Sequence, residues 1–173
     1  AKEIFIYLLS LAAGQTKEQV TAALWPDLTS ARGSSNFHIN LYRARQAVMP
    51  VIFSQDRGKY CINPEVNIDF DLFRFQSLIK DSHTLSDNQK TVCLEQATAL
   101  YRGPFAREIY SDWVEGIRQA TENEYLKALF LLVNLYAARH DDLKAISTLE
   151  RLISADPYQD EAYSRLMELQ MAN

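Results

Sequence analysis

The side chains best suited to chemistry in this chain gather between residues 32 and 46. Most are hydrogen-bonding groups, one is aliphatic, and no Asp or Glu occurs from Ala31 to Gln55. Arginine can donate two hydrogen bonds to guanine O6 and N7, asparagine or glutamine can read adenine, and an aliphatic side chain can touch a thymine methyl. This chemistry fits the base edges of a nucleic-acid duplex. The candidate contact residues are Arg32, Ser35, His38, Ile39, Asn40, Tyr42, Arg43 and Gln46.

Signals for catalysis or metal binding are weak by comparison. The three histidines are far apart in sequence, and none forms a two-histidine metal spacing. The five glycines do not cluster into a loop that would cradle phosphates. Trp113, Tyr125, Tyr136 and Tyr163 can form a ligand surface, but aromatic residues at helical spacing are more typical of a core. We therefore expect no enzyme activity, no cofactor and no metal.

A helix must position the candidate contacts. It is predicted to follow Thr29 or Ser30, either of which can serve as N-cap, and to run to Met49, where Pro50 stops it. At about 100° per residue, four apolar residues fall on one stripe and form the predicted buried face. The stripe consists of Phe37, Leu41, Ala44 and Val48. An ordinary solvated face is the alternative for the remaining surface, although such a face usually mixes both signs of charge.

Two further helices are predicted ahead of this one. A capping-box pattern at residues 16–19 predicts a helix from Lys17, and the Trp-Pro pair at residues 25–26 predicts its end near Leu24. Apolar residues at helical spacing near the start of the chain predict an earlier helix that packs on the other two. These residues are Ile4, Tyr7, Leu8 and Leu11.

A β-hairpin is predicted after the third helix. Residues 51–54 and 59–62 are β-branched or aromatic runs around a polar turn in which Gly58 can adopt positive φ. Arg57 and Lys59 lie at or beside the tip, where they can meet phosphates or a minor groove. A solvated hairpin turn is the alternative reading of these two residues.

The order of these elements, together with residues 23–27 and 36–48, resembles the winged-helix domain in the antibiotic-regulatory-protein class of bacterial activators. The resemblance implies that the third helix enters the major groove, with Arg43 as the safest contact. Arg43 and Arg45 occupy an Arg-x-Arg pair typical of that family. The family's domain begins with a small β-sheet ahead of the first helix, which this chain lacks. We therefore expect the chain to be an excerpt of a longer protein.

The net charge of -4 conceals an asymmetry between the two halves. Residues 1–63 hold seven Lys/Arg and four Asp/Glu, a net of +3, whereas residues 64–173 hold eleven and eighteen, a net of -7. The positive half contains the candidate contacts, as an electrostatic footprint for nucleic acid requires. Because the excess is small, we expect weak DNA binding by a single copy and dependence on a homodimer or a tandem site.

The second half is predicted to be entirely helical, and we assign residues 1–66 and 67–173 to two domains. A tetratricopeptide pattern of about 34 residues fits from Leu126 onward, and Pro157 closes the unit. A second unit is predicted to start at Asp160, with Tyr163 and Leu166 at its apolar positions. The predicted core residues of the first unit are Leu129, Leu132, Tyr136, Ala145, Leu149 and Leu152.

Five ordered segments in this half resemble the bacterial transcriptional activator domain that follows the winged helix in the same regulators. They lie at residues 100–105, 112–114, 118, 156–158 and 161–167. The resemblance implies a helical repeat used for protein contacts, with RNA polymerase or the protein's own regulatory domains as partners.

The sequence thus predicts a mainly α fold, in which three helices and a hairpin wing precede a tetratricopeptide-like repeat domain. The predicted function is a DNA-binding transcriptional regulator. The alternative is a repeat scaffold for protein contacts whose first half does not bind DNA. A cytoplasmic location is expected, because no run approaches about 18 uninterrupted apolar residues and the two cysteines are best read as reduced core residues.

Overall fold

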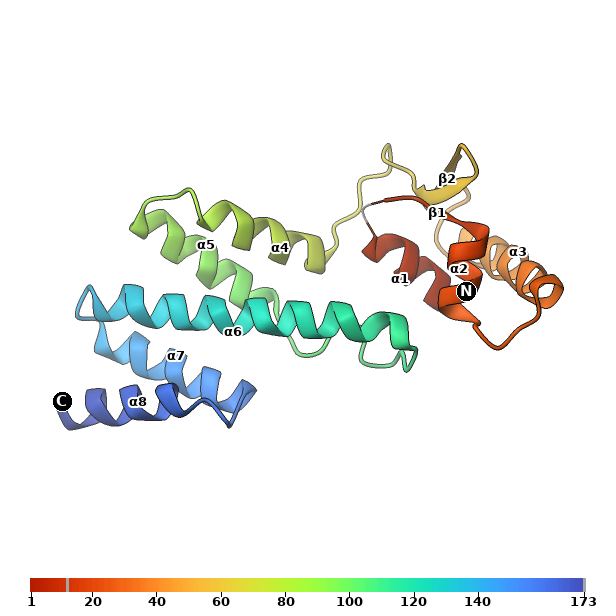
Figure 1. Cartoon of the computed structure of the whole chain (residues 1–173). Coiled ribbons are helices and arrows are strands. Elements are labelled where there is room, and N and C mark those ends of the chain that lie inside the picture. The colour runs from red at the N-terminus through yellow and green to blue at the C-terminus, as the bar shows by residue number, and fades with distance from the viewer. Residues whose placement is uncertain (12, 173) are drawn as a thin grey trace. The chain divides into compact units, whose positions relative to one another are not determined.

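The computed structural model describes residues 1–11 and 13–172. It is mainly α-helical with one small sheet, which confirms the predicted fold class (Figure 1). The chain forms two compact units. The first comprises Ala1–Asp69 with Ala106–Ile117, and the second comprises Phe70–Phe105 with Arg118–Asn173. The sequence-based division at residue 67 instead places residues 106–117 in the second domain.

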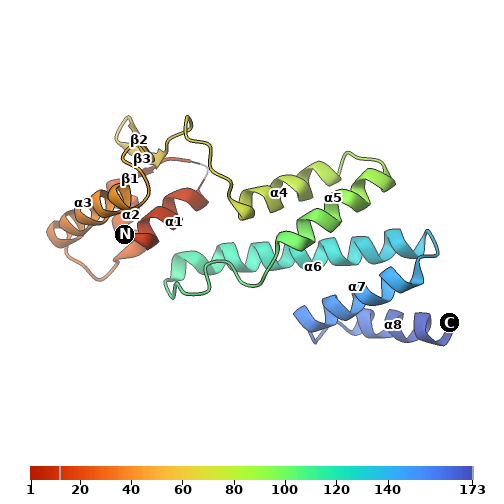
Figure 2. The ribbon, with the colours of Figure 1, turned by 180° about the vertical axis from the view of Figure 1, so that it is seen from behind.

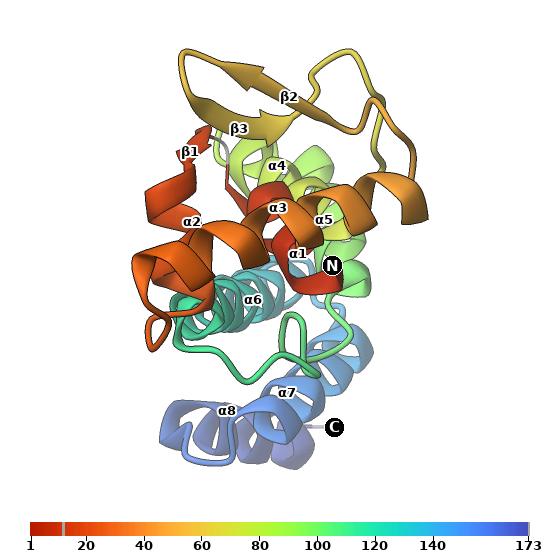
Figure 3. The ribbon, with the colours of Figure 1, turned by 90° about the vertical axis from the view of Figure 1, so that its right-hand side faces the viewer.

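Among the described residues, the first unit contains three α-helices, a three-stranded sheet and one short 3-10 helix. Figure 3 shows the three helices and the sheet. The helices are α1 (Lys2–Ser10), α2 (Lys17–Leu24) and α3 (Ser30–Ala47), and the 3-10 helix is η1 (Asp112–Val114). The strands are β1 (Gln15–Thr16), β2 (Phe53–Asp56) and β3 (Lys59–Ile62). Both strand pairs are antiparallel, and β3 lies in the middle of the order β1-β3-β2.

Helix α2 has the predicted bounds because its end signals are local. The Thr16 hydroxyl accepts a hydrogen bond from the Gln19 backbone N–H at 3.2 Å, and the Gln19 side chain accepts from the Thr16 N–H at 2.8 Å. These two bonds form the capping box expected from the sequence. Beyond the other end, Pro26 removes Trp25 from the α region.

Helix α3 ends two residues earlier than predicted, at Ala47. Phe37, Leu41 and Ala44 are buried as predicted, but Val48 is 47 % exposed, so its assignment to the buried stripe was wrong. Val48 is the C-cap and lies past the last helical turn, where it no longer follows the helical period. The buried face of α3 is completed at the other end by Gly33.

The hairpin is confirmed, although β2 begins two residues later than predicted. Val51 lies in a turn and is 60 % exposed, and the strand extends through Asp56. The two central residues, Arg57 and Gly58, both have positive φ, at 48° and 78°. Such a two-residue turn matches the right-handed twist of the strands that flank it.

One core joins the helices of the first unit to its sheet. Phe37 of α3 contacts Tyr60 of β3 edge to face, with ring centroids 4.8 Å apart. The apolar residues predicted for the first helix take part, since Ile4, Tyr7 and Leu8 are buried. The buried members are Ile4, Tyr7, Leu8, Val20, Leu24, Phe37, Leu41, Ala44, Ile52, Phe53 and Tyr60.

The second unit is built from helices that follow one another in antiparallel order (Figures 1 and 2). They are α4 (Asp71–Ser82), α5 (Asp87–Leu100), α6 (Glu115–Ala137), α7 (Asp142–Ala155) and α8 (Asp160–Ala172), and residues 115–117 at the start of α6 are counted with the first unit. Helix α5 starts after its N-cap residue Ser86. Glu122 and Glu124 lie within α6, which begins at Glu115.

The predicted repeat register accounts for the packing of α6 and α7. All six residues assigned to the core of the first repeat are buried, and Ala145, Leu149 and Leu152 are fully so. The prediction for the next repeat is only partly right. Leu166 packs against the core, whereas Tyr163 is 39 % exposed on α8.

Candidate nucleic-acid interface

Helix α3 presents two distinct faces. One face is buried in the first unit through Gly33, Phe37, Leu41 and Ala44. The other is open, and Ile39 and Tyr42 on it are 47 % and 64 % exposed. Of the eight predicted contact residues on this helix, seven are exposed and Asn40 is half-buried. The exposed seven are Arg32, Ser35, His38, Ile39, Tyr42, Arg43 and Gln46.

The direction of the open face is fixed by packing on the opposite side. Buried Gly33 meets Thr21 of α2, and a Cβ placed on Gly33 would lie 3.5 Å from the Thr21 Cβ. An alanine would make an ordinary contact there, and a larger side chain would separate the helices. Together with the Phe37–Tyr60 ring contact, this close approach holds α3 between α2 and the sheet.

Two of the predicted contacts are already engaged inside the protein. The Asn40 Nδ2 donates to the Asn36 carbonyl at 2.9 Å. The Ser35 hydroxyl donates to the Ala31 carbonyl at 3.2 Å. While these bonds hold, the Ser35 hydroxyl can meet a ligand only as an acceptor, and the Asn40 amide keeps one N–H and its oxygen for a base.

The arginines of α3 differ in their surroundings. Arg43 is exposed, whereas Arg45 is half-buried and its Nε atom is buried without a hydrogen-bond partner in the described part of the chain. No acidic residue lies on α3 to offset these charges. Arg43 therefore has the freedom to approach a partner, and part of the Arg45 guanidinium packs against protein.

The hairpin tip carries two further positive side chains, whose charge is partly offset by a neighbouring carboxylate. Arg57 and Lys59 are both exposed. Asp56 pairs in register with Lys59 across the two-residue turn, which places a carboxylate beside these cations. Figure 3 shows the hairpin above α3 within the same unit. The solvated-turn alternative for Arg57 and Lys59 stays open.

Two features of this unit were missed by sequence reasoning. Strand β1 has only two residues, too few to show a period, and it pairs Gln15 with Tyr60 and Thr16 with Lys59. Residues 106–117 also join the unit, and the sequence singles out only residues 112–114 of that segment, as part of the second domain.

No metal site or membrane span was found in the part of the chain that the structure describes. Residues 1–11 and 13–172 hold no group of three or more His, Cys, Asp or Glu arranged to bind an ion. None of their helices combines the length and the apolar character that crossing a bilayer requires.

A protein-family model matches the second part of the chain. The model of a family described as bacterial transcriptional activator domain matches residues 70–172, more than half of the chain. A comparison with curated proteins found no match.

Proposed function

Because the chain belongs to the family that carries a bacterial transcriptional activator domain, we propose that it is a transcriptional regulator that binds double-stranded DNA through α3. The match supports the role in transcriptional regulation. DNA binding rests on one observation, which is the open, acid-free face of α3 with its exposed Arg43 and Tyr42.

In this proposal the first unit is a winged helix and α3 lies in the major groove. Arg43 donates to a guanine, His38 and Gln46 bond to base edges, and the Ile39 side chain packs on a thymine methyl. Tyr42 bonds to a base edge or a phosphate through its hydroxyl. Arg57 and Lys59 bind phosphates beside the groove and fix the position of the domain on the duplex.

The second unit contacts proteins in this proposal. Stacked helix pairs bury their own cores and offer long outer surfaces, which suits binding of RNA polymerase or of other domains of the same protein. A homodimer would add the second DNA contact that one weakly charged unit needs. A cytoplasmic location follows from the proposed contact with chromosomal DNA.

A specific observation favours the second candidate, a protein-binding scaffold without DNA binding. The first compact unit, counted with residues 106–117, holds eight Lys/Arg and nine Asp/Glu, a net charge of -1. Attraction to DNA must then come from the local field of α3 and the hairpin and not from the unit as a whole.

A salt titration separates the two candidates. The chain is incubated with a random-sequence duplex library, bound duplexes are enriched, and the dissociation constant is measured at several salt concentrations. DNA binding predicts that affinity falls steeply with salt, because each phosphate contact adds about 0.9 to the slope of log affinity against log salt. If the whole protein does not bind duplex DNA even at low salt, the second candidate, a protein-binding scaffold, is the correct one.

A further inference from the structure

Residues 106–117 lie inside the matched activator domain in sequence, yet they pack with the first unit. We propose that this segment, here called the strap, couples the activator domain to DNA binding by holding α1, and through α1 the DNA-contacting helix α3. The inference rests on the proposed function for its DNA readout, and on the packing within the first unit for its mechanism.

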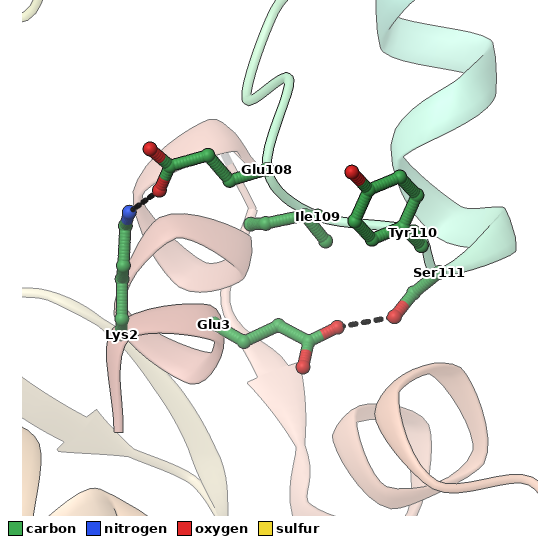
Figure 4. A pocket seen from close by; sticks show the side chains of 6 residues that line it. All are labelled: Lys2, Glu3, Glu108, Ile109, Tyr110 and Ser111. Carbon is green, nitrogen blue, oxygen red and sulfur yellow. Dashed lines mark hydrogen bonds and ion pairs between the residues drawn. The ribbon is translucent and has the colours of Figure 1, made fainter.

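The Glu3 carboxylate is the anchor of the strap on α1. Its Oε1 atom accepts hydrogen bonds from the Ser111 hydroxyl at 2.5 Å and from the Trp113 indole Nε1–H at 3.1 Å. Figure 4 shows the bond from Ser111 to Glu3. Glu3 and Trp113 are half-buried, where bonds to a charged acceptor are stronger than in open water.

Apolar packing joins the strap to the same helix. The Trp113 ring meets the Tyr7 ring edge to face, with centroids 5.1 Å apart and an interplanar angle of 86°. Val114 is fully buried and Ile109 is 8 % exposed. Burial also raises the pKa of the Tyr7 hydroxyl above its ordinary value. The strap is therefore a part of the unit's core and not a loop lying on its surface.

A third contact between the strap and α1 is an exposed ion pair, which we use as a control for the half-buried Glu3 contact. Lys2 pairs with Glu108, and the two side chains are 68 % and 79 % exposed (Figure 4). The hydrogen bond from Lys2 holds the pKa of Glu108 below its usual range. Exposed ion pairs contribute little to stability, so this pair marks the edge of the strap without anchoring it.

The contacts between the strap and α1 can affect α3 because α1 and α3 share one hydrophobic core. Ile4 and Leu8 of α1 are buried in the same cluster as Phe37 and Leu41 of α3. Close-packed interiors transmit small displacements, so a shift of α1 changes how α3 is seated. A protein that binds the activator domain and alters the strap would thereby alter DNA affinity.

The test uses the full chain with Glu3→Gln and, as a matched control, Glu108→Gln. Both variants remove one carboxylate charge, so their general electrostatic effect on DNA binding is the same. We expect Glu3→Gln to weaken binding to an enriched duplex about fivefold, the cost of losing charge assistance in a part-buried bond. Backbone amides of α1 and α3 should exchange hydrogen faster, while those of α7 stay unchanged. Glu108→Gln should match the unmodified chain within about twofold.

The outcomes distinguish this inference from the proposed function. If Glu3→Gln and Glu108→Gln behave alike in both readouts, the strap does not position α3, and the DNA-binding proposal is untouched. If the unmodified chain binds no duplex, the proposed function fails, and amide exchange in α3 alone decides the role of the strap. Should Glu3→Gln fail to fold, Trp113→Phe removes the indole donor and keeps an aromatic ring against Tyr7.

Discussion

Helices α3 and α6 show how differently one chain can use a long helix. In α6, eight residues from Thr121 to Tyr136 are buried, and seven of them belong to two core clusters in the second unit. In α3, four buried residues form one stripe, and the remaining surface is polar and open. A helix covered on several sides serves the fold, whereas a helix covered on one side keeps a surface available for a partner.

The charges of the two helices support the same contrast. Helix α6 carries Glu115, Glu122 and Glu124 with Arg118 and Lys127, the mixture of signs expected of a solvated surface. Helix α3 carries three arginines and no acid. Its composition therefore requires an explanation beyond solubility, and a polyanionic partner supplies one.

The largest effect is expected inside the second unit. Leu149→Asp places a charge at a fully buried position of α7 and should unfold that unit, at a cost of about 4 kcal/mol or more. Leu143→Asp is the matched control, since Leu143 on the same helix is 82 % exposed. Thermal melting followed by circular dichroism measures both. A native-like melting curve for Leu149→Asp would show that the repeat register is wrong.

The next effect tests the open face of α3. Arg43→Ala should weaken binding to a specific duplex by about 1–3 kcal/mol if Arg43 reads a guanine, and it should leave the melting temperature unchanged. Arg102→Ala, an exposed arginine in the second unit, controls for loss of one positive charge. Equal weakening on all duplex sequences would instead make Arg43 a phosphate contact. No weakening beyond that of Arg102→Ala would remove Arg43 from the interface.

A pH-dependent effect is expected at the buried face of α6. The Tyr136 hydroxyl donates to Glu95 Oε1 at 2.5 Å, and burial followed by this carboxylate raises the pKa of Tyr136. Its contribution to stability is fully present below the ordinary tyrosine pKa of 10.0 and is lost as pH rises beyond it, because the unfolded state ionises first.

Tyr136→Phe should cost about 1.5 kcal/mol at neutral pH through the lost hydrogen bond. Above pH 10 the difference from the unmodified chain should shrink, since phenylalanine does not ionise. Urea unfolding at pH 7 and at alkaline pH measures this, and a difference that grows with pH would contradict it.

The smallest effect compares two helix starts in the first unit. Thr16→Ala removes a capping bond at the start of α2 and should cost about 1 kcal/mol of unfolding free energy. Thr29→Ala at the start of α3 should cost much less, because the Thr29 side chain makes no capping bond. Chemical denaturation measures the unfolding free energy of both variants. Equal losses of unfolding free energy would contradict the prediction.

The sequence predicted best what depends on neighbouring residues. The ends of α2 follow from Thr16, Gln19 and the Trp-Pro pair, all within about one turn of the helix ends, and their positions were correct. Helical periodicity predicted which face of α3 is open. The predicted burial of Val48 was wrong because Val48 lies beyond the last helical turn, where the periodicity ends.

Long-range contacts were out of reach of the same reasoning. Glu3 and Trp113 are 110 residues apart, and nothing near either residue indicates the other. Two residues alone do not specify a strand. Strand β1 forms because its backbone can pair with the free edge of β3. Tyr163 has the right register for a core residue, but burial also depends on what packs over it.

Photo-cross-linking tests the central claim, contact between α3 and DNA, most directly. Tyr42 and Tyr158 are 64 % and 91 % exposed, on α3 and just before α8 respectively. Each is replaced in turn by p-benzoylphenylalanine in the full chain, which is then irradiated with an enriched duplex. The account predicts a cross-link to DNA from position 42 and none from position 158. Cross-linking from position 158 alone, or from neither position while the duplex stays bound, would contradict it.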